Sequence, residues 1–250
     1  MEYFPEYNWC VSAPMLALPP MVYAGAAVLG SRKYPEGLAI NVKNMMRVYN
    51  VVQIAVCLYM TIGLSPVVTF PNVFGINSDF TAAGEWFVFV HYLSKYLDWF
   101  DTFFIVAKGN AAKQLSFLHV YHHATIGVVW GMLLHLGSGN GTARYGAFIN
   151  SVTHVIMYSH YLWTSFGLKN PIKGLITRWQ IFQFYTCFLH AVLVISGVWI
   201  VERQIPYALG WMQFFYHVTM IYLFTWKLKW VPKVYLSLSD TTTGPAKKQR

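Results

Sequence analysis

Long apolar segments separated by short basic loops constrain this chain most. Seven can be drawn, at residues 15–30, 46–68, 84–106, 115–136, 145–167, 175–200 and 207–231. An α-helix rises about 1.5 Å per residue, so about 20 apolar residues cross the hydrocarbon core of a bilayer. Charged residues make up 11% of the chain, whereas a soluble domain carries about 25%. The sequence therefore predicts an all-α, polytopic membrane protein with seven transmembrane helices.

The charges between these segments predict an orientation. Basic residues follow the odd-numbered segments or border them: Arg32, Lys33, Lys43, Arg47, Lys108, Lys113, Lys169, Lys173, Arg178, Lys227, Lys229 and Lys233. The other side holds only Arg144 and Arg203. By the positive-inside rule we expect a luminal N-terminus and a cytosolic C-terminus. The net charge of +9 then reflects topology, and no nucleic-acid partner is expected.

The ends of the chain suggest one domain and one tail. We expect residues 1–236 to form a single transmembrane domain and residues 237–250 to form a disordered cytosolic tail. The tail ends in Lys247-Lys248-Gln249-Arg250, which resembles a dilysine retrieval signal of endoplasmic reticulum membrane proteins. A basic tail that lies near an anionic leaflet is the alternative.

Three local features lead to further expectations. Glu2 and Glu6 lie where a secretory signal would be positive, so the first apolar segment is expected to stay in the protein. That segment contains Pro19 and Pro20, so its helix is expected to start after a break or to tilt. Asn140 begins a glycosylation sequon, but the predicted luminal loop is so short that we expect no glycan there.

A histidine cluster begins the fourth segment. The stretch QLSFLHVYHH, from Gln114 to His123, places His119, His122 and His123 three and four residues apart. On a helix these imidazoles share one face within about one turn. Polar side chains are costly inside a bilayer, so such a cluster is a functional-site hypothesis by default. Histidines that are hydrogen-bonded in a bundle core are the structural alternative.

Other polar groups are predicted at a similar depth. Lys95, Asp98 and Asp101 follow one another at i, i+3 steps, so opposite charges can pair, and an ion pair that only joins helices is the alternative. The fifth segment carries Asn150, His154, Tyr158 and Tyr161, and the sixth begins with Thr177, Arg178, Gln180 and Gln183. A hydrogen-bond network between helices would explain these glutamines equally well. The isolated histidines, His91, His135, His190 and His217, are expected to be structural.

Polar groups at one depth in several membrane helices would line a reaction chamber that opens to the cytosol. Two chemistries fit a chamber of this kind. A metal-dependent desaturase or hydroxylase would need Asp98 or Asp101 to supplement His122 and His123, because only one histidine box is present. A decarboxylative condensation needs a site for an acyl group, donors for an enolate and little water. Neutral imidazoles can accept an acyl group, and a carboxylate behind one fixes its tautomer. A receptor or transporter is a third, non-enzymatic class.

Four patterns in this order resemble the ELO-type very-long-chain fatty acid elongases, which are condensing enzymes of the endoplasmic reticulum. KxxExxDT is met by Lys95, Asp98, Asp101 and Thr102; QxxFLHxxHH by Gln114, Phe117, Leu118, His119, His122 and His123; NxxxHxxMYxYY by Asn150, His154, Met157, Tyr158 and Tyr161; TxxQxxQ by Thr177, Gln180 and Gln183. Asp98 replaces the usual Glu, and His160 replaces the usual Tyr. The wording of the second and third patterns looks more like that of the polyunsaturated-chain elongases.

The resemblance implies a fold, a reaction and catalytic roles. Six of the seven helices would close around a tunnel for the acyl chain. A long-chain acyl-CoA and malonyl-CoA would give a 3-ketoacyl-CoA, carbon dioxide and CoA. His122 would attack the thioester and hold the acyl group, and His154 would help to decarboxylate malonyl-CoA. Orienting roles would fall to His119, His123, Lys95, Asp98, Asp101 and Asn150. A concerted route without a covalent intermediate is the rival.

The resemblance also implies substrate contacts and partners. Contacts with substrate are expected from Gln114, Tyr158, Tyr161, Thr177, Gln180 and Gln183, and contacts with CoA phosphates from Lys108, Lys113, Lys169, Lys173 and Arg178. Ordinary positive-inside charge explains each of these cations equally well. No bound cofactor and no metal are expected. The expected partners are the ketoacyl reductase, dehydratase and enoyl reductase of the elongation cycle, with a homodimer as a further assembly.

Overall fold

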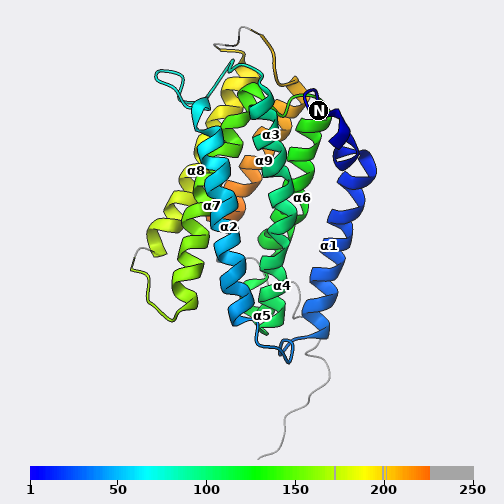
Figure 1. The fold of residues 1–250 in the computed structure, drawn as a ribbon, viewed down its shortest axis with the longest axis vertical. Coiled ribbons are helices and arrows are strands. Elements are labelled where there is room, and N and C mark those ends of the chain that lie inside the picture. Colours follow the sequence, from blue (N-terminus) through cyan, green and yellow to red (C-terminus); the bar gives the residue numbers. More distant parts are fainter. Residues whose placement is uncertain (172, 199, 201, 226–250) are drawn as a thin grey trace, which may run out of the picture.

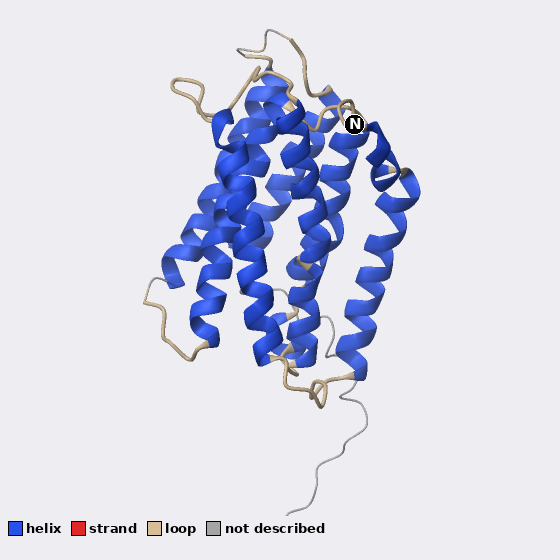
Figure 2. Cartoon of the chain, viewed as in Figure 1, coloured by secondary structure: helices blue, strands red, loops and turns tan. Residues whose placement is uncertain are grey.

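The computed structural model describes residues 1–171, 173–198, 200 and 202–225. Every regular element in this part of the chain is helical (Figure 2). The longer elements are α1 (Ala13–Lys33), α2 (Lys43–Leu64), α3 (Ala82–Leu97), α4 (Trp99–Ala107), α6 (Phe117–His135), α7 (Arg144–Ser165), α8 (Lys173–Ser196) and α9 (Tyr207–Thr225). The shorter ones are α5 (Ala111–Gln114) and the 3-10 turns Pro5–Val11, Ser65–Val67 and Gly141–Ala143. The long helices lie side by side (Figure 1).

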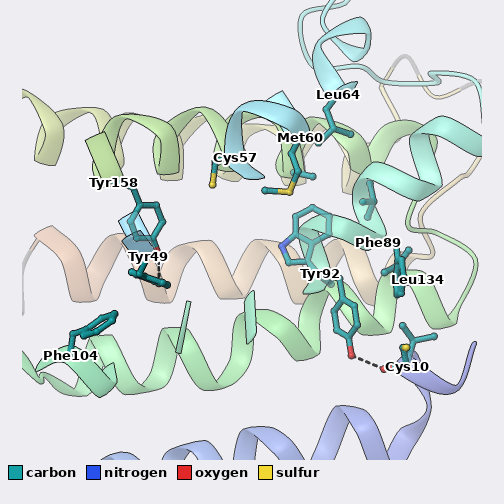
Figure 3. Close-up of a cluster of buried hydrophobic side chains, with 14 of the residues drawn as sticks. Cys10, Tyr49, Cys57, Met60, Leu64, Phe89, Tyr92, Phe104, Leu134 and Tyr158 are labelled. Atoms are coloured by element: carbon teal, nitrogen blue, oxygen red, sulfur yellow. Dashed lines mark hydrogen bonds between the residues drawn. The ribbon is translucent and has the colours of Figure 1, made fainter. Parts of the chain in front are cut away.

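The packing order of the helices places the site. α2 packs along α7 and beside α3, α3 packs on α6, α6 touches α9, and α9 packs along α8, which returns to α7. These helices therefore follow one another as neighbours. α1 lies at the edge of the bundle, where it contacts α6 and α4 (Figure 1). The main hydrophobic core fills the space between α2, α3, α6 and α7 (Figure 3).

The basic loops gather at one end of the bundle, which we call the basic end. The helix ends located there are those of α1, α4 and α7, together with the beginnings of α2, α6 and α8 (Figure 1). They carry Arg32, Lys33, Lys43, Lys108, Lys113, Lys169, Lys173 and Arg178. The opposite end holds Arg144 and Arg203. The alternation of charge predicted from the sequence is therefore present in the fold.

Four helices of the described part are long and apolar enough to cross a membrane. They are Ala13–Lys33, Lys43–Val67, Phe117–His135 and Lys173–Ser196, judged by length and composition alone. Large hydrophobic side chains also cover outward surfaces, as Leu18, Met21, Val22 and Leu29 do on α1. An apolar exterior of this kind suits lipid rather than water. The protein is thus an all-helical membrane protein.

The first helix differs from one part of the expectation. α1 begins at Ala13 and continues through Pro19 and Pro20, so the helix is not broken at its prolines, and its tilt in a membrane stays a prediction. A proline removes the hydrogen bond to the carbonyl four residues earlier, which for Pro19 is that of Met15. The hydroxyl of Tyr96 on α3 donates to this carbonyl at 3.4 Å. A side chain of a neighbouring helix thereby satisfies the freed acceptor, and the helix can continue.

The third and fourth segments also differ from the prediction. The third was expected as one helix at residues 84–106, but α3 ends at Leu97 and α4 begins at Trp99, with Asp98 at the junction. The fourth was expected to start at 115, but Ser116 caps α6, accepting the backbone N–H of His119 at 3.2 Å. Gln114 therefore lies in α5, apart from the helix that carries the histidines.

Asn140 is held in the structure by its own side chain. It is buried, and its amide nitrogen donates to the carbonyl of Thr81 at 2.9 Å. This nitrogen is the atom that would carry a glycan, so the fold agrees with an unmodified sequon. The predicted tail at 237–250, the cations Lys227, Lys229 and Lys233, and the end of the last apolar segment lie outside the described residues.

Candidate functional site

The three histidines of the box meet near the start of α6. The ring centroids of His119 and His123 are 4.3 Å apart, and those of His122 and His123 are 5.7 Å apart. The helical spacing explains this, because residues three and four apart share a face. The grouping predicted from the sequence is therefore present.

His119 belongs to a hydrogen-bond chain across three helices. Its Nε2 lies 2.7 Å from Oγ1 of Thr102 on α4, and this hydroxyl lies 2.7 Å from the phenol of Tyr23 on α1. Tyr23 stacks on Trp99, whose indole N–H donates to the carbonyl of His123 at 2.8 Å. The peripheral helix α1 thus helps to fix the box.

His122 points to another helix. Its Nδ1 lies 3.0 Å from the phenol oxygen of Tyr216 on α9. Thr125, one turn along α6, also lies 3.4 Å from that oxygen. Within the described part of the chain Nε2 of His122 makes no hydrogen bond, so this ring nitrogen is available for chemistry while Nδ1 is held.

A second buried group, which we call the His154 cluster, joins α2, α3, α4 and α7. It consists of Tyr49, Gln53, Lys95, Asp98, Asp101, Asn150, His154 and Tyr158. Lys95 pairs with Asp98 at 3.2 Å, as their i, i+3 spacing predicts, and donates to Asn150 at 3.0 Å. Both charged side chains are buried, so the pairing offsets a large cost of desolvation.

Asp98 and Asp101 share one phenol. Tyr158 reaches Oδ1 of Asp98 at 3.0 Å and Oδ2 of Asp101 at 2.8 Å. Gln53 donates to the same oxygen of Asp98 at 2.9 Å, and Nδ1 of His154 lies 3.8 Å from its other oxygen. The carboxylates thus face Tyr158 and His154, while the described hydrogen bonds of His119 and His122 go to Thr102 and Tyr216.

The box and the His154 cluster belong to one interior. Lys95 of the His154 cluster lies against α6, the helix that carries the box, since a Cβ on Gly127 would be 3.8 Å from Cβ of Lys95. Depth along the helices agrees with this, since both groups lie in the half of the bundle nearer the basic end, with His154 towards its middle. The zone of polar residues predicted from the sequence is therefore assembled by the fold.

Unused hydrogen-bonding atoms mark this interior. Eight buried side-chain atoms have no partner among the described residues, and five of them belong to these two groups or lie one turn from them: Nδ2 of Asn50, Oε1 of Gln53, Nε2 of His91, Nδ1 of His123 and Nδ1 of His154. Buried polar atoms are normally satisfied, because an unmatched one costs about 1 to 3 kcal/mol. Donors and acceptors grouped in this way can take up the polar groups of a substrate.

The residues expected to contact substrate lie in different settings. Gln114, Lys108, Lys113, Thr177 and Arg178 are exposed and belong to the connections and helix starts of the basic end. Tyr161 is 40% exposed beside Tyr158, with ring centroids 5.9 Å apart. Gln180 donates to the sulfur of Met157 at 3.4 Å, and Gln183 is buried. The hydroxyl of Tyr158 is engaged by the two carboxylates.

The described part of the chain groups no three side chains of His, Cys, Asp or Glu in a way that could hold a metal ion. The histidines of the box instead face a threonine and a tyrosine. The desaturase-type alternative, which needs Asp98 or Asp101 beside His122 and His123, therefore finds no ligand set among these residues.

Sequence reasoning missed four residues that the structure brings to the site, namely Tyr23, Tyr49, Gln53 and Tyr216. A signal existed for one of them. Gln53 lies one turn after Asn50 within an apolar segment, and two amides on one helix face are costly there. The tyrosines gave no such signal, because the chain holds 17 of them.

Comparison with known proteins independently supports the family resemblance found in the sequence. A model of the family described as ELO, the GNS1/SUR4 family, matches residues 9–227. "Fatty acid elongase 5" of Leishmania major is 44% identical over 222 residues, which cover 89% of this chain and 87% of that protein. "Fatty acid elongase 4" of Trypanosoma brucei brucei is 44% identical over 225 residues, covering 89% and 86%. "Fatty acid elongase 5" of Trypanosoma cruzi is 40% identical over 222 residues, covering 89% and 85%.

Proposed function

The chain belongs to the ELO family of fatty acid elongases, and from this premise we propose that it catalyses the condensing step of fatty acid chain elongation. A long-chain acyl-CoA and malonyl-CoA react to give a 3-ketoacyl-CoA two carbons longer, with release of carbon dioxide and CoA. The observation that carries the proposal is Nε2 of His122, which makes no hydrogen bond among the described residues and lies on a helix that Lys95 of the His154 cluster packs against.

His122 is the nucleophile of the first step. Tyr216 holds Nδ1, and Nε2 attacks the thioester carbonyl. The nitrogen–carbon bond forms, the carbon–sulfur bond breaks, and CoA departs with that electron pair. The acyl group then rests on the imidazole. His119 and His123, whose rings pack against one another, keep the box in position.

The second step forms the carbon–carbon bond near His154. Malonyl-CoA loses carbon dioxide, and the electron pair of the broken bond stays on the enolate. The enolate carbon attacks the acyl carbon, and the imidazole of His122 leaves. His154, which lies beside Asp98, and Asn150, which accepts from Lys95, stabilise the enolate oxygen through hydrogen bonds. Burial keeps water from protonating the carbanion.

The helix order and the charges support the membrane setting that we propose. Seven spans cross the endoplasmic reticulum membrane, and α2, α3, α6, α9, α8 and α7 enclose the acyl chain while α1 remains outside. The basic end faces the cytosol, so the N-terminus is luminal and the C-terminus cytosolic. CoA phosphates bind at the basic end. The protein works without a bound cofactor or metal. It passes its 3-ketoacyl-CoA product to the reductase and dehydratase of the elongation cycle.

The test is an incubation of purified protein in detergent with saturated and polyunsaturated acyl-CoAs, labelled malonyl-CoA and a chelator. Mass spectrometry should find a 3-ketoacyl-CoA two carbons longer, absent in His122→Ala. His135→Ala is the matched control, because His135 is exposed at the other end of the same helix and should leave the product unchanged. No product from folded wild-type protein would overturn the proposal, and product lost only with chelator would restore a metal-dependent reading.

A trapping experiment separates the two routes. Protein incubated with an acyl-CoA alone and then digested should carry the acyl mass on the peptide that contains His122. Acyl groups on no histidine, in protein that still makes product, would leave the concerted route in which histidine acts only as a base.

A further inference from the structure

The proposed reaction consumes one proton in each turnover. Malonyl-CoA enters as a carboxylate and leaves its carboxyl group as carbon dioxide, while the thioester sulfur leaves as a thiol. The electron pair of the carbon–sulfur bond stays on sulfur, and a proton must join it. The site around His154 is buried, so this proton needs a path. The following inference rests on the proposed function for its use of the proton.

The shared phenol of Tyr158 shows where a proton is held. Its oxygen lies within hydrogen-bond distance of Asp98 and of Asp101, yet the phenol has a single proton. Two ionised carboxylates would therefore compete for one donor, and one of them would face a lone pair. A proton on one carboxyl group removes the conflict, because that group then donates to the phenol oxygen while the phenol donates to the other.

The surrounding charges decide which carboxyl group is protonated. Asp98 pairs with Lys95 at 3.2 Å and accepts from Gln53, so its charge is compensated. Asp101 lies 2.8 Å from the phenol of Tyr158 on α7, which in turn lies 3.2 Å from the phenol of Tyr49 on α2 and packs near the ring of Tyr161. No cation contacts it in the described part of the chain. An unpaired carboxylate inside a bundle is costly, whereas its protonated form is not.

The exposure of these groups gives the path a direction. Asp101 is half-buried on α4, towards the basic end. Tyr158 and Asp98 are fully buried, at 0% and 2% exposure. His154 lies beyond them, with Nδ1 at 3.8 Å from Asp98 and without another partner among the described residues. Asp101, the outer group, can take up a proton again from the basic end, whereas His154, the inner group, faces the reaction.

We propose that Asp101 stores a proton in the resting protein and that Tyr158 and Asp98 relay it to His154 during condensation. The proton of Asp101 moves to the oxygen of Tyr158, and that of Tyr158 moves to Oδ1 of Asp98. The carboxyl group of Asp98 then turns about its Cβ–Cγ bond, so that the protonated oxygen faces Nδ1 of His154 and passes the proton to it. Because the thiol takes the N–H proton of His122 in the first step, the imidazole of His122 leaves the acyl carbon one proton short in the second. His154 gives the proton of its other nitrogen to this leaving imidazole, and Asp101 is left as a carboxylate until water reprotonates it. The last link is open at 3.8 Å and closes by about 1 Å when substrate fills the site.

Infrared spectroscopy tests the stored proton without any turnover. Wild-type protein should show the carbonyl stretch of a protonated carboxylic acid, which shifts in deuterium oxide. Asp101→Asn should remove this band, and Asp101→Glu should keep one. Glu85→Gln is the matched control, because Glu85 is also buried but already accepts two backbone N–H groups. No band in wild-type protein, or a band that survives Asp101→Asn, would overturn the stored proton.

Kinetics test the relay. Tyr158→Phe should keep the infrared band but lower kcat about 100-fold, with KM changed less than threefold, since the relay does not touch substrate. The solvent isotope effect on kcat should be larger in wild-type protein than in this variant. An unchanged kcat or isotope effect would overturn the relay while product formation by wild-type protein still supports the condensing activity. Absence of product from wild-type protein would instead defeat the proposed function and leave the infrared result standing.

Discussion

Two clusters in this bundle each combine a buried histidine with glutamine side chains and differ in how completely they are hydrogen-bonded. The His190 cluster, made of Thr142, His190, Gln204 and Gln213, lies at the end opposite the basic loops. His190 donates from Nε2 to the carbonyl of Thr142 at 3.1 Å, and its Nδ1 accepts from Gln213 at 3.1 Å. None of these side chains has an unpartnered buried atom among the described residues. The His154 cluster and the neighbouring box contain several.

The difference separates a structural network from a site. A network whose donors and acceptors are all matched stabilises one arrangement of helices and leaves nothing for a ligand. A buried group with unmatched atoms costs stability and is kept where another molecule completes it. In this protein the complete network joins the 3-10 turn Gly141–Ala143 to α8 and α9 near one end, and the incomplete one lies between α2, α3, α4 and α7.

The largest effect that tests this comparison is expected when His154 is replaced. His154→Gln should lower kcat about 1000-fold, since it removes the group that faces the reaction. The unfolding temperature in detergent should stay within about 2 °C, because Nδ1 of His154 makes no hydrogen bond that would be lost. Turnover by mass spectrometry and thermal unfolding measure the two effects. A large fall in stability with kcat intact would assign His154 to the scaffold.

At the His190 cluster we expect the opposite pattern, which is a loss of stability without a loss of turnover. His190→Ala should destabilise the fold by about 2 to 4 kcal/mol, because it removes the hydrogen bonds to the carbonyl of Thr142 and from the amide of Gln213, together with a ring stacked on Tyr145. Folded protein should keep its kcat. His190→Gln is the matched variant, since an amide can donate to one partner and accept from the other. Loss of turnover in correctly folded His190→Gln would extend the site to this end.

The sequence predicted the helices and the groups on each helix face well, and failed where contacts between helices decide the outcome. The box, the Lys95–Asp98 pair and the placement of His154 follow from spacings of three and four residues within apolar segments. Spacing cannot say which helix faces another. Carboxylates behind the box were therefore expected, whereas the described partners of His119 and His122 are Thr102 and Tyr216.

The errors at helix ends have local causes of a similar kind. The continuation of α1 through Pro19 depends on Tyr96, which lies 77 residues away in the sequence and donates to the carbonyl of Met15. The separation of Gln114 from the box depends on Ser116, which caps α6. A cap of this kind was readable in advance, because serine is a preferred N-cap residue, whereas a contact between distant segments was not.

A milder change sharpens the role of α9. Tyr216→Phe removes the hydroxyl that holds Nδ1 of His122 and keeps the aromatic packing against Tyr121. We expect kcat to fall about tenfold, which corresponds to one hydrogen bond of about 1.4 kcal/mol. Acyl transfer should be slowed in trapping experiments at short times, with the same final adduct. Tyr222→Phe, further along the same helix, is the control and should not change turnover.

The smallest effect is expected at the basic end, where exposed charge attracts the substrate but does not position it. Lys108 and Lys113 are exposed in the connection between α4 and α6. Replacing both by alanine should raise the KM for acyl-CoA about threefold at low salt with little change in kcat, because exposed charges act through a screened field. Lys33→Ala is the matched control, since Lys33 is exposed at the same end but on the peripheral helix α1. The difference should disappear at high ionic strength. A KM effect that persists there would indicate a direct contact with the CoA phosphates, and an equal effect of Lys33→Ala would reduce both to the general charge of this end.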